Sequence, residues 1–179
     1  MLPVLNIMSL AVFSLAAASI VAAPAGLRTD DGDDGAADGV ARLVAPILEY
    51  TRWPVEPGTV RLCVLGPASH AAKLTRLALS PGRTAVRRDI TADSAAIRAS
   101  CDALYIGDLG LPALRAVTAG IRGSAIVTIA ERDPDCRGET MFCMVFAPGR
   151  LSFMINIDAV SRSGVRIDPR VLRLAKGGR

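Results

Sequence analysis

The sequence has few of the side chains on which catalysis usually depends. It contains one histidine, one tryptophan and two tyrosines among 179 residues, and aromatic residues make up 4% of the chain. Acid–base and nucleophilic catalysis usually need a histidine, paired carboxylates, or an activated serine or cysteine. The only histidine, His70, stands beside Ser69 at the expected start of a helix, where capping is the simpler role. We therefore expect a protein that is not an enzyme and that has no cofactor.

Charged side chains are also missing from the N-terminus, where none precedes Arg28. Residues 5–23 form an apolar stretch that ends in small residues, and Ala23 and Ala25 fit a small-x-small cleavage rule. This pattern predicts a signal peptide over residues 1–25 and export to the periplasm. Because no basic residue precedes the apolar stretch, an uncleaved membrane anchor is the alternative, since a span needs about 20 apolar residues.

Residues 26–38 are acidic and rich in glycine, and from Arg28 onward they have no large apolar side chain that a core would bury. They are predicted to form a flexible linker before a single domain over residues 39–175, with a basic tail over 176–179. The aspartates come in adjacent pairs instead of the alternating EF-hand spacing, which argues against a calcium site.

The hydrophobic pattern of the domain alternates between helical and extended stretches. Helices are predicted over residues 39–52, 69–79, 92–100 and 111–119, and strands over 59–66, 83–90, 102–106 and 124–130. Trp53 is predicted to lie in or beside the core. Glu131, Asp133 and Asp135 fall in a turn that contains a proline, and they are predicted to be solvated loop charges instead of a metal site.

Two apolar runs, 141–146 and 151–158, follow the last of these strands. Pro148 and Gly149 lie between them, so the runs predict a C-terminal hairpin in which Phe153, Ile155 and Ile157 share one apolar face. A short helix, capped by Asn156 or Asp158, and further helical turns up to residue 175 are expected to follow. The order of elements predicts an α/β fold: a mixed β-sheet with helices packed on its faces.

The cysteines include no Cys-x-x-Cys pair, which argues against structural zinc. An even set of four in a chain expected to be exported predicts two disulfides, for which three pairings are open. Cys136 and Cys143 flank a short turn, so closure between them is easy. Cys63 and Cys101 belong to strand candidates that could be neighbours, so the spacing favours the pairs Cys63–Cys101 and Cys136–Cys143.

Four features of the chain, taken in order, resemble the YfiR family of small periplasmic proteins. They are the stretch Tyr50–Pro54 (YTRWP), the strand 60–66 (VRLCVLG), the spacing of the four cysteines, and a closing segment with FMIN at 153–156, GVRI at 164–167 and VLRLA at 171–175. The likeness covers roughly residues 39–175. It implies the same disulfide pairing, and it implies a protein that inhibits a membrane-bound diguanylate cyclase from the periplasmic side.

On this resemblance we expect a negative regulator that binds the periplasmic part of the cyclase and represses cyclic di-GMP synthesis. An outer-membrane lipoprotein is a candidate for a partner that releases it, and a homodimer is left open. The expected contact residues are Val160, Arg162, Val165 and Ile167 in the apolar and basic C-terminal segment. A solvated helix face is the simpler interpretation of the late basic excess, and we expect no nucleic-acid partner.

The alternative is a periplasmic small-ligand binding module without a cyclase partner. Arg52 and Arg166 both lie in stretches that resemble the family, and a guanidinium suits planar and phosphate ligands. We expect that the two arginines approach one another and hold an anion or an aromatic molecule. Ordinary surface arginines with buried stems are the simpler interpretation.

Overall fold

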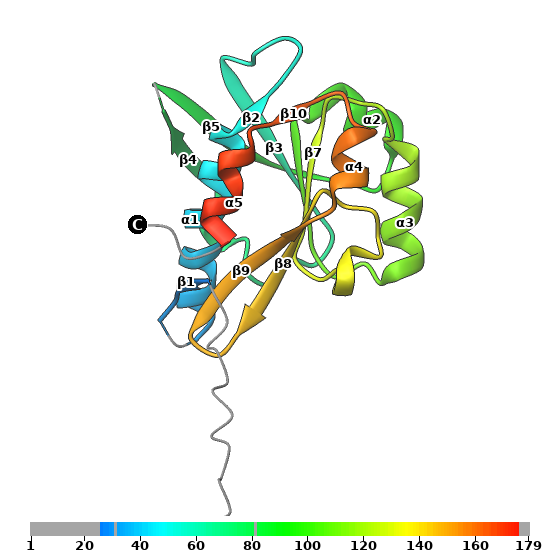
Figure 1. Cartoon of the computed structure of the whole chain (residues 1–179). Coiled ribbons are helices and arrows are strands. Elements are labelled where there is room, and N and C mark those ends of the chain that lie inside the picture. The colour runs from blue at the N-terminus through cyan, green and yellow to red at the C-terminus, as the bar shows by residue number, and fades with distance from the viewer. Residues whose placement is uncertain (1–25, 31, 81, 176–179) are drawn as a thin grey trace, which may run out of the picture.

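An eight-stranded mixed sheet lies at the centre of the computed structural model, which describes residues 26–30, 32–80 and 82–175. The strand order is β1-β9-β8-β7-β6-β3-β5-β4 (Figure 1). Neighbouring strands are parallel from β5 (Arg83–Ile90) through β3 (Thr59–Leu65), β6 (Ala103–Ile106) and β7 (Val127–Ala130) to β8 (Phe142–Ala147). Antiparallel strands complete both sides: β4 (Arg76–Leu79), β9 (Arg150–Ile155) and β1 (Leu27–Arg28).

Helices cover both faces of this sheet, as the sequence predicted. Helix α1 (Asp33–Glu49) packs on one face, and α2 (Ser94–Ser100) and α3 (Leu111–Gly120) pack on the other (Figure 1). Side chains of strand β3 point alternately to the two faces of the sheet, and each face has its own core. Val60, Leu62 and Val64 lie in the core on the α1 side, whereas Cys63 and Leu65 lie in the core on the α2–α3 side. The fold class is therefore α/β, with apolar residues facing both ways along the central strands.

Helix α1 begins six residues earlier than the sequence pattern predicted, so part of the expected linker is ordered in the fold. Gly39 helps the helix to fit: a Cβ there would lie 2.6 Å from Cγ2 of Thr29, just after β1, so a larger residue would require this side chain to move. The helix also continues through Pro46 to Glu49. A proline near the end of a helix removes only one hydrogen bond to the preceding turn.

The prediction of a helix over residues 69–79 is wrong. A 3-10 turn, η1 (Ala72–Leu74), is followed directly by strand β4, which pairs antiparallel with β5. Buried Leu77 and Leu79 alternate with exposed Arg76 and Ala78, a period of two that the helical spacing of Leu74 and Leu77 conceals in the sequence.

The C-terminal hairpin forms as predicted from β8 and β9, with Ala147 opposite Arg150 across the Pro148–Gly149 turn. The second strand ends at Ile155, and helix α4 (Ile157–Ser161) begins at once, so Ile157 is 67% exposed instead of lying on the apolar face of the strand. The chain then forms β10 (Arg166–Ile167), η3 (Pro169–Val171) and α5 (Leu172–Ala175). Strand β10 pairs with β2 (Thr51–Arg52) in a separate two-stranded sheet.

Both predicted disulfides are present, Cys63–Cys101 with a Cα–Cα distance of 5.7 Å and Cys136–Cys143 with 5.6 Å. The first lies in the core under α2, and the second closes the loop that follows η2 (Pro134–Cys136). The predicted signal peptide and basic tail lie outside the described residues. Within the part of the chain that the structure describes, no helix is both long and apolar enough to cross a membrane.

Candidate functional site

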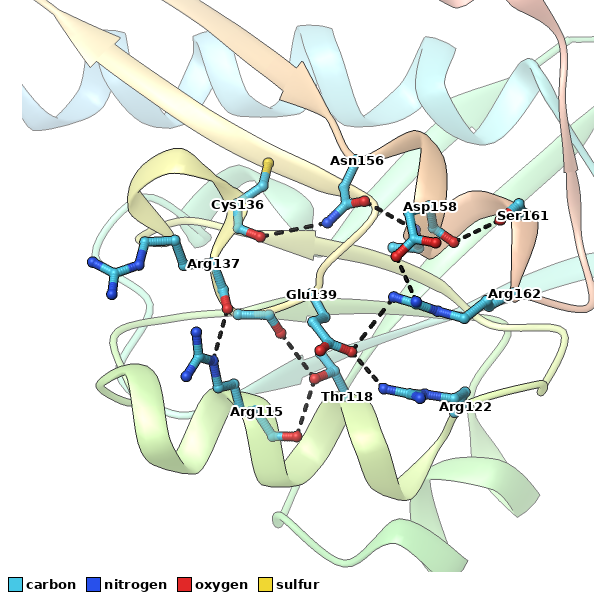
Figure 2. A network of polar contacts seen from close by, with 12 residues as sticks. Arg115, Thr118, Arg122, Cys136, Arg137, Glu139, Asn156, Asp158, Ser161 and Arg162 are labelled. Atoms are coloured by element: carbon cyan, nitrogen blue, oxygen red, sulfur yellow. Dashed lines mark hydrogen bonds and ion pairs between the residues drawn. The ribbon is translucent and has the colours of Figure 1, made fainter.

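The loop closed by Cys136–Cys143 is joined by polar contacts to the helices on either side (Figure 2). Glu139, whose backbone has a positive φ of 62°, accepts a hydrogen bond from Arg122 at 2.6 Å and lies 3.6 Å from Arg162. Arg122 follows the end of α3, and Arg162 is the C-cap of α4. One carboxylate therefore connects the disulfide loop to two helices that are distant in sequence.

Asn156 makes a second connection between this loop and α4 (Figure 2). Its side-chain oxygen caps α4 by accepting from Ala159 N at 2.9 Å, and its amide nitrogen donates to Cys136 O at 3.5 Å. Its backbone N–H donates to Met141 O at 2.9 Å. The residue that starts α4 is thus held by both ends of the disulfide loop, so the position of α4 depends on the shape of that loop.

The four expected contact residues have different environments. Arg162 is exposed, and Val160 and Ile167 are half-buried against the core on the α1 side of the sheet. Val165 is only 5% exposed and is part of that core. We therefore remove Val165 from the candidate surface, because a buried side chain holds the fold and is not available to a partner.

Arg52 and Arg166 do approach one another, because they are direct partners in the register of β2 and β10. Both side chains are exposed, and Arg52 donates to the Glu49 carbonyl at 2.7 Å. Two like charges opposite each other are unfavourable unless an anion lies nearby. Arg170 donates to the Asp168 carboxylate at 2.6 Å and, with a smaller effect from Arg52, lowers the pKa of Asp168 to about 2, which keeps this anion charged.

Glu131 is the most connected polar side chain at the carboxyl ends of the parallel strands. It is 8% exposed, and it accepts from the backbone N–H of Ser69 at 2.9 Å, from His70 N and Nδ1 at 3.3 and 2.9 Å, and from the Tyr105 hydroxyl at 3.0 Å. Burial, reinforced by the Glu131 charge, raises the pKa of Tyr105, so its hydroxyl remains a donor. Glu131 therefore holds together the loop after β3 and the ends of β6 and β7.

His70 is accordingly not the helix cap that its position in the sequence suggested. It lies in a turn, bonds Glu131, and stacks on Phe146 of β8 with 4.5 Å between ring centroids. Its partners are 61 and 76 residues away, so no local pattern could indicate them.

Asp133 also differs from the expected solvated charge. It is 2% exposed and accepts from Gly138 N at 2.7 Å and Thr140 Oγ1 at 2.8 Å, which shapes the disulfide loop. Asp135 is exposed, as predicted. Trp53 is 6% exposed, also as predicted, and its indole N–H donates to Asp102 O at 3.1 Å.

These contacts arrange polar side chains for holding segments together. Glu131 and Asp133 accept hydrogen bonds on every carboxylate oxygen, which is typical of buried acids that stabilise loops. Within the described residues, no group of three or more histidine, cysteine and acidic side chains is placed to hold a metal ion.

Replacing Glu131 with glutamine is expected to lower the free energy of unfolding by about 2 kcal/mol. Either orientation of the amide would turn its NH2 towards a backbone N–H, that of Ser69 or that of His70, and would leave this donor without its acceptor. Urea unfolding of Glu131→Gln against Glu139→Gln measures this, because Glu139 makes exposed ion pairs worth less than about 1 kcal/mol. Equal losses in the two variants would contradict the role assigned to Glu131.

A family model described as YfiR/HmsC-like matches residues 38–176. The match contains every element from the middle of α1 to α5, both disulfides, the Arg52–Arg166 pair and the Glu131 contacts. It agrees with the resemblance drawn from the motifs. Because the model spans well over half of the chain, the protein belongs to the YfiR/HmsC-like family.

Proposed function

We propose that this protein is a periplasmic negative regulator that binds the periplasmic part of a membrane-bound diguanylate cyclase and represses cyclic di-GMP synthesis. The observation that carries the proposal is membership in the YfiR/HmsC-like family, which supports a periplasmic regulatory role in cyclic di-GMP signalling. Two disulfides fit a protein that works in an oxidising compartment. The polar contacts described above hold the fold together, which suits an interaction protein better than an enzyme.

Repression through binding requires a preference between two states of the cyclase. A regulator that binds only the inactive state shifts the population towards it, and a shift from 1:99 to 99:1 needs about 5.5 kcal/mol of differential binding. A partner that competes for the same surface, such as an outer-membrane lipoprotein, would reverse the shift.

The surface that we assign to the cyclase is the exposed side of α4. Ile157, the first residue of the helix, is 67% exposed, and the exposed Arg162 is the C-cap at its other end. Arginine is enriched at energetically important positions of protein interfaces, and an exposed isoleucine offers apolar area to a partner. Because Glu139 and Asn156 hold α4 against the disulfide loop, this surface is presented in one orientation.

Ile157→Glu is expected to weaken co-purification of the cyclase with this protein by at least tenfold. A charge in the apolar centre of an interface must be desolvated without a partner, which costs more than about 1.4 kcal/mol. Val55→Glu is the matched control, because Val55 is 84% exposed and belongs to the β2–β3 connection instead of α4. If both variants retain the cyclase equally, the α4 surface is not the contact.

The register of Arg52 and Arg166 favours a second candidate, a small-ligand binding module. Two exposed guanidinium groups side by side suit a carboxylate or phosphate on a planar molecule. The ionised Asp168 nearby would be the group that such an anion competes with.

A double variant, Arg52→Ala with Arg166→Ala, is expected to abolish any rise in melting temperature that phosphate or an aromatic carboxylate produces in the native protein. Arg88→Ala removes one exposed arginine from β5 and is expected to keep the response. Thermal melts with each anion measure both. An unchanged response in the double variant removes this candidate.

A further inference from the structure

The carboxyl ends of β3, β6 and β7 meet at one edge of the sheet. From β3 the sheet continues to β5 on one side and to β6 on the other, so the direction of the strand order reverses at β3. Open α/β sheets bind ligands at such a reversal of strand order. Here the two loops are in direct contact: a Cβ on Gly107 would lie 2.2 Å from Pro67 O, and Asp108 N donates to the same carbonyl at 2.9 Å. The loops after β3 and β6 therefore pack directly on one another at Gly107.

The next gap along the same edge is hollow. A cavity of about 220 Å³ lies between the loop after β6 and the loop after β7. Leu111 and Leu114 of α3 and Pro134 of η2 form its apolar wall, and Leu114 is 2% exposed. The volume suits a molecule somewhat smaller than the ligands of typical drug-sized pockets.

The charges around this cavity leave one guanidinium free. Asp108 and Arg132 pair with each other at 3.3 Å, and the oxygens of Asp133 bond Gly138 and Thr140 of its own loop. The exposed Arg137 makes no ion pair and its guanidinium no hydrogen bond within residues 26–30, 32–80 and 82–175. The cavity thus combines an apolar wall with a guanidinium at its rim that has no side-chain partner among the described residues.

We propose that this cavity binds a small aliphatic carboxylate, with its hydrocarbon part against Leu111, Leu114 and Pro134 and its carboxylate on Arg137. A guanidinium binds a carboxylate through charge-assisted hydrogen bonds, and burial of each CH2 adds about 0.8 kcal/mol. This site is separate from the Arg52–Arg166 pair, and it does not depend on the proposed cyclase partner. Because Arg137 belongs to the disulfide loop, the ligand would contact the segment that holds α4.

Hexanoate is the probe, titrated by calorimetry into the full mature protein. Saturable binding is expected for hexanoate, with at least tenfold weaker binding of acetate, which lacks the chain, and of hexanol, which lacks the charge. Arg137→Ala is expected to weaken hexanoate binding about tenfold, and Leu111→Ser to weaken it several-fold. Arg88→Ala is the control and is expected to bind hexanoate like the native protein.

Melting curves of the variants establish that each one is folded. The inference is overturned if hexanoate shows no saturable binding, if hexanol or inorganic phosphate binds as tightly, or if Arg137→Ala and Leu111→Ser both bind like the native protein. Loss of hexanoate binding in the Arg52→Ala, Arg166→Ala variant with retention in Arg137→Ala would assign the ligand to the other arginine pair, and would overturn the inference as well.

Discussion

Replacing Cys63 and Cys101 together with alanine is expected to lower the free energy of unfolding by about 4 kcal/mol. The bridge joins residues 38 positions apart, and the loss of chain entropy in the unfolded state grows with the length of the closed loop. The two residues are 0% and 2% exposed, so the change also removes packing from the core on the α2–α3 side. Guanidinium unfolding of the oxidised native protein and of the variant measures the difference.

The second bridge supplies the control for this experiment. Cys136 and Cys143 are 7 positions apart, and their replacement is expected to cost about 2.5 kcal/mol. The order of the two losses is the test, because it follows from loop length. If removal of Cys136–Cys143 destabilises the protein more than removal of Cys63–Cys101, the polar contacts of the short loop contribute more to stability than the core bridge does.

Much of the fold could be predicted because the sequence patterns are local. Strand β5 has the expected bounds, helix α3 extends by one residue, and the hairpin forms around Pro148 and Gly149. Asn156 caps α4 as one of the two expected residues. In each case the deciding interactions lie within a few residues, so spacing and turn residues are sufficient.

The errors occur where distant partners decide the structure. The segment 69–79 has leucines at helical spacing, but β5 offers an open strand edge, and pairing with it makes Arg76–Leu79 a strand. Likewise the sequence around Glu131 is typical of a solvated loop charge, whereas in the fold Ser69, His70 and Tyr105 donate hydrogen bonds to its carboxylate. A proline-containing turn rich in acids does not reveal that two of the acids are buried.

The candidate site shows the same division. Arg52 and Arg166 both lie in stretches that resemble the family, and their cross-strand register follows from the pairing of β2 and β10. Val165 is apolar and lies in a basic segment, a pattern that favours a contact surface, and only the fold shows that it is buried. The contacts of Glu139 with Arg122 and Arg162 join three segments, and no spacing in the sequence indicates them.

Deleting the gene is expected to raise cellular cyclic di-GMP several-fold, because the cyclase would lose the partner that stabilises its inactive state. The native gene supplied in trans is expected to restore the low level. The Ile157→Glu variant, exported and folded to the same extent, is expected not to restore it, because its exposed contact residue is altered while the core is unchanged.

Cellular cyclic di-GMP in the deletion strain, with and without the native gene, is the most direct measurement of repression by this protein. A rise that the native gene reverses agrees with a repressor that acts by binding. An unchanged level in the deletion strain would contradict it.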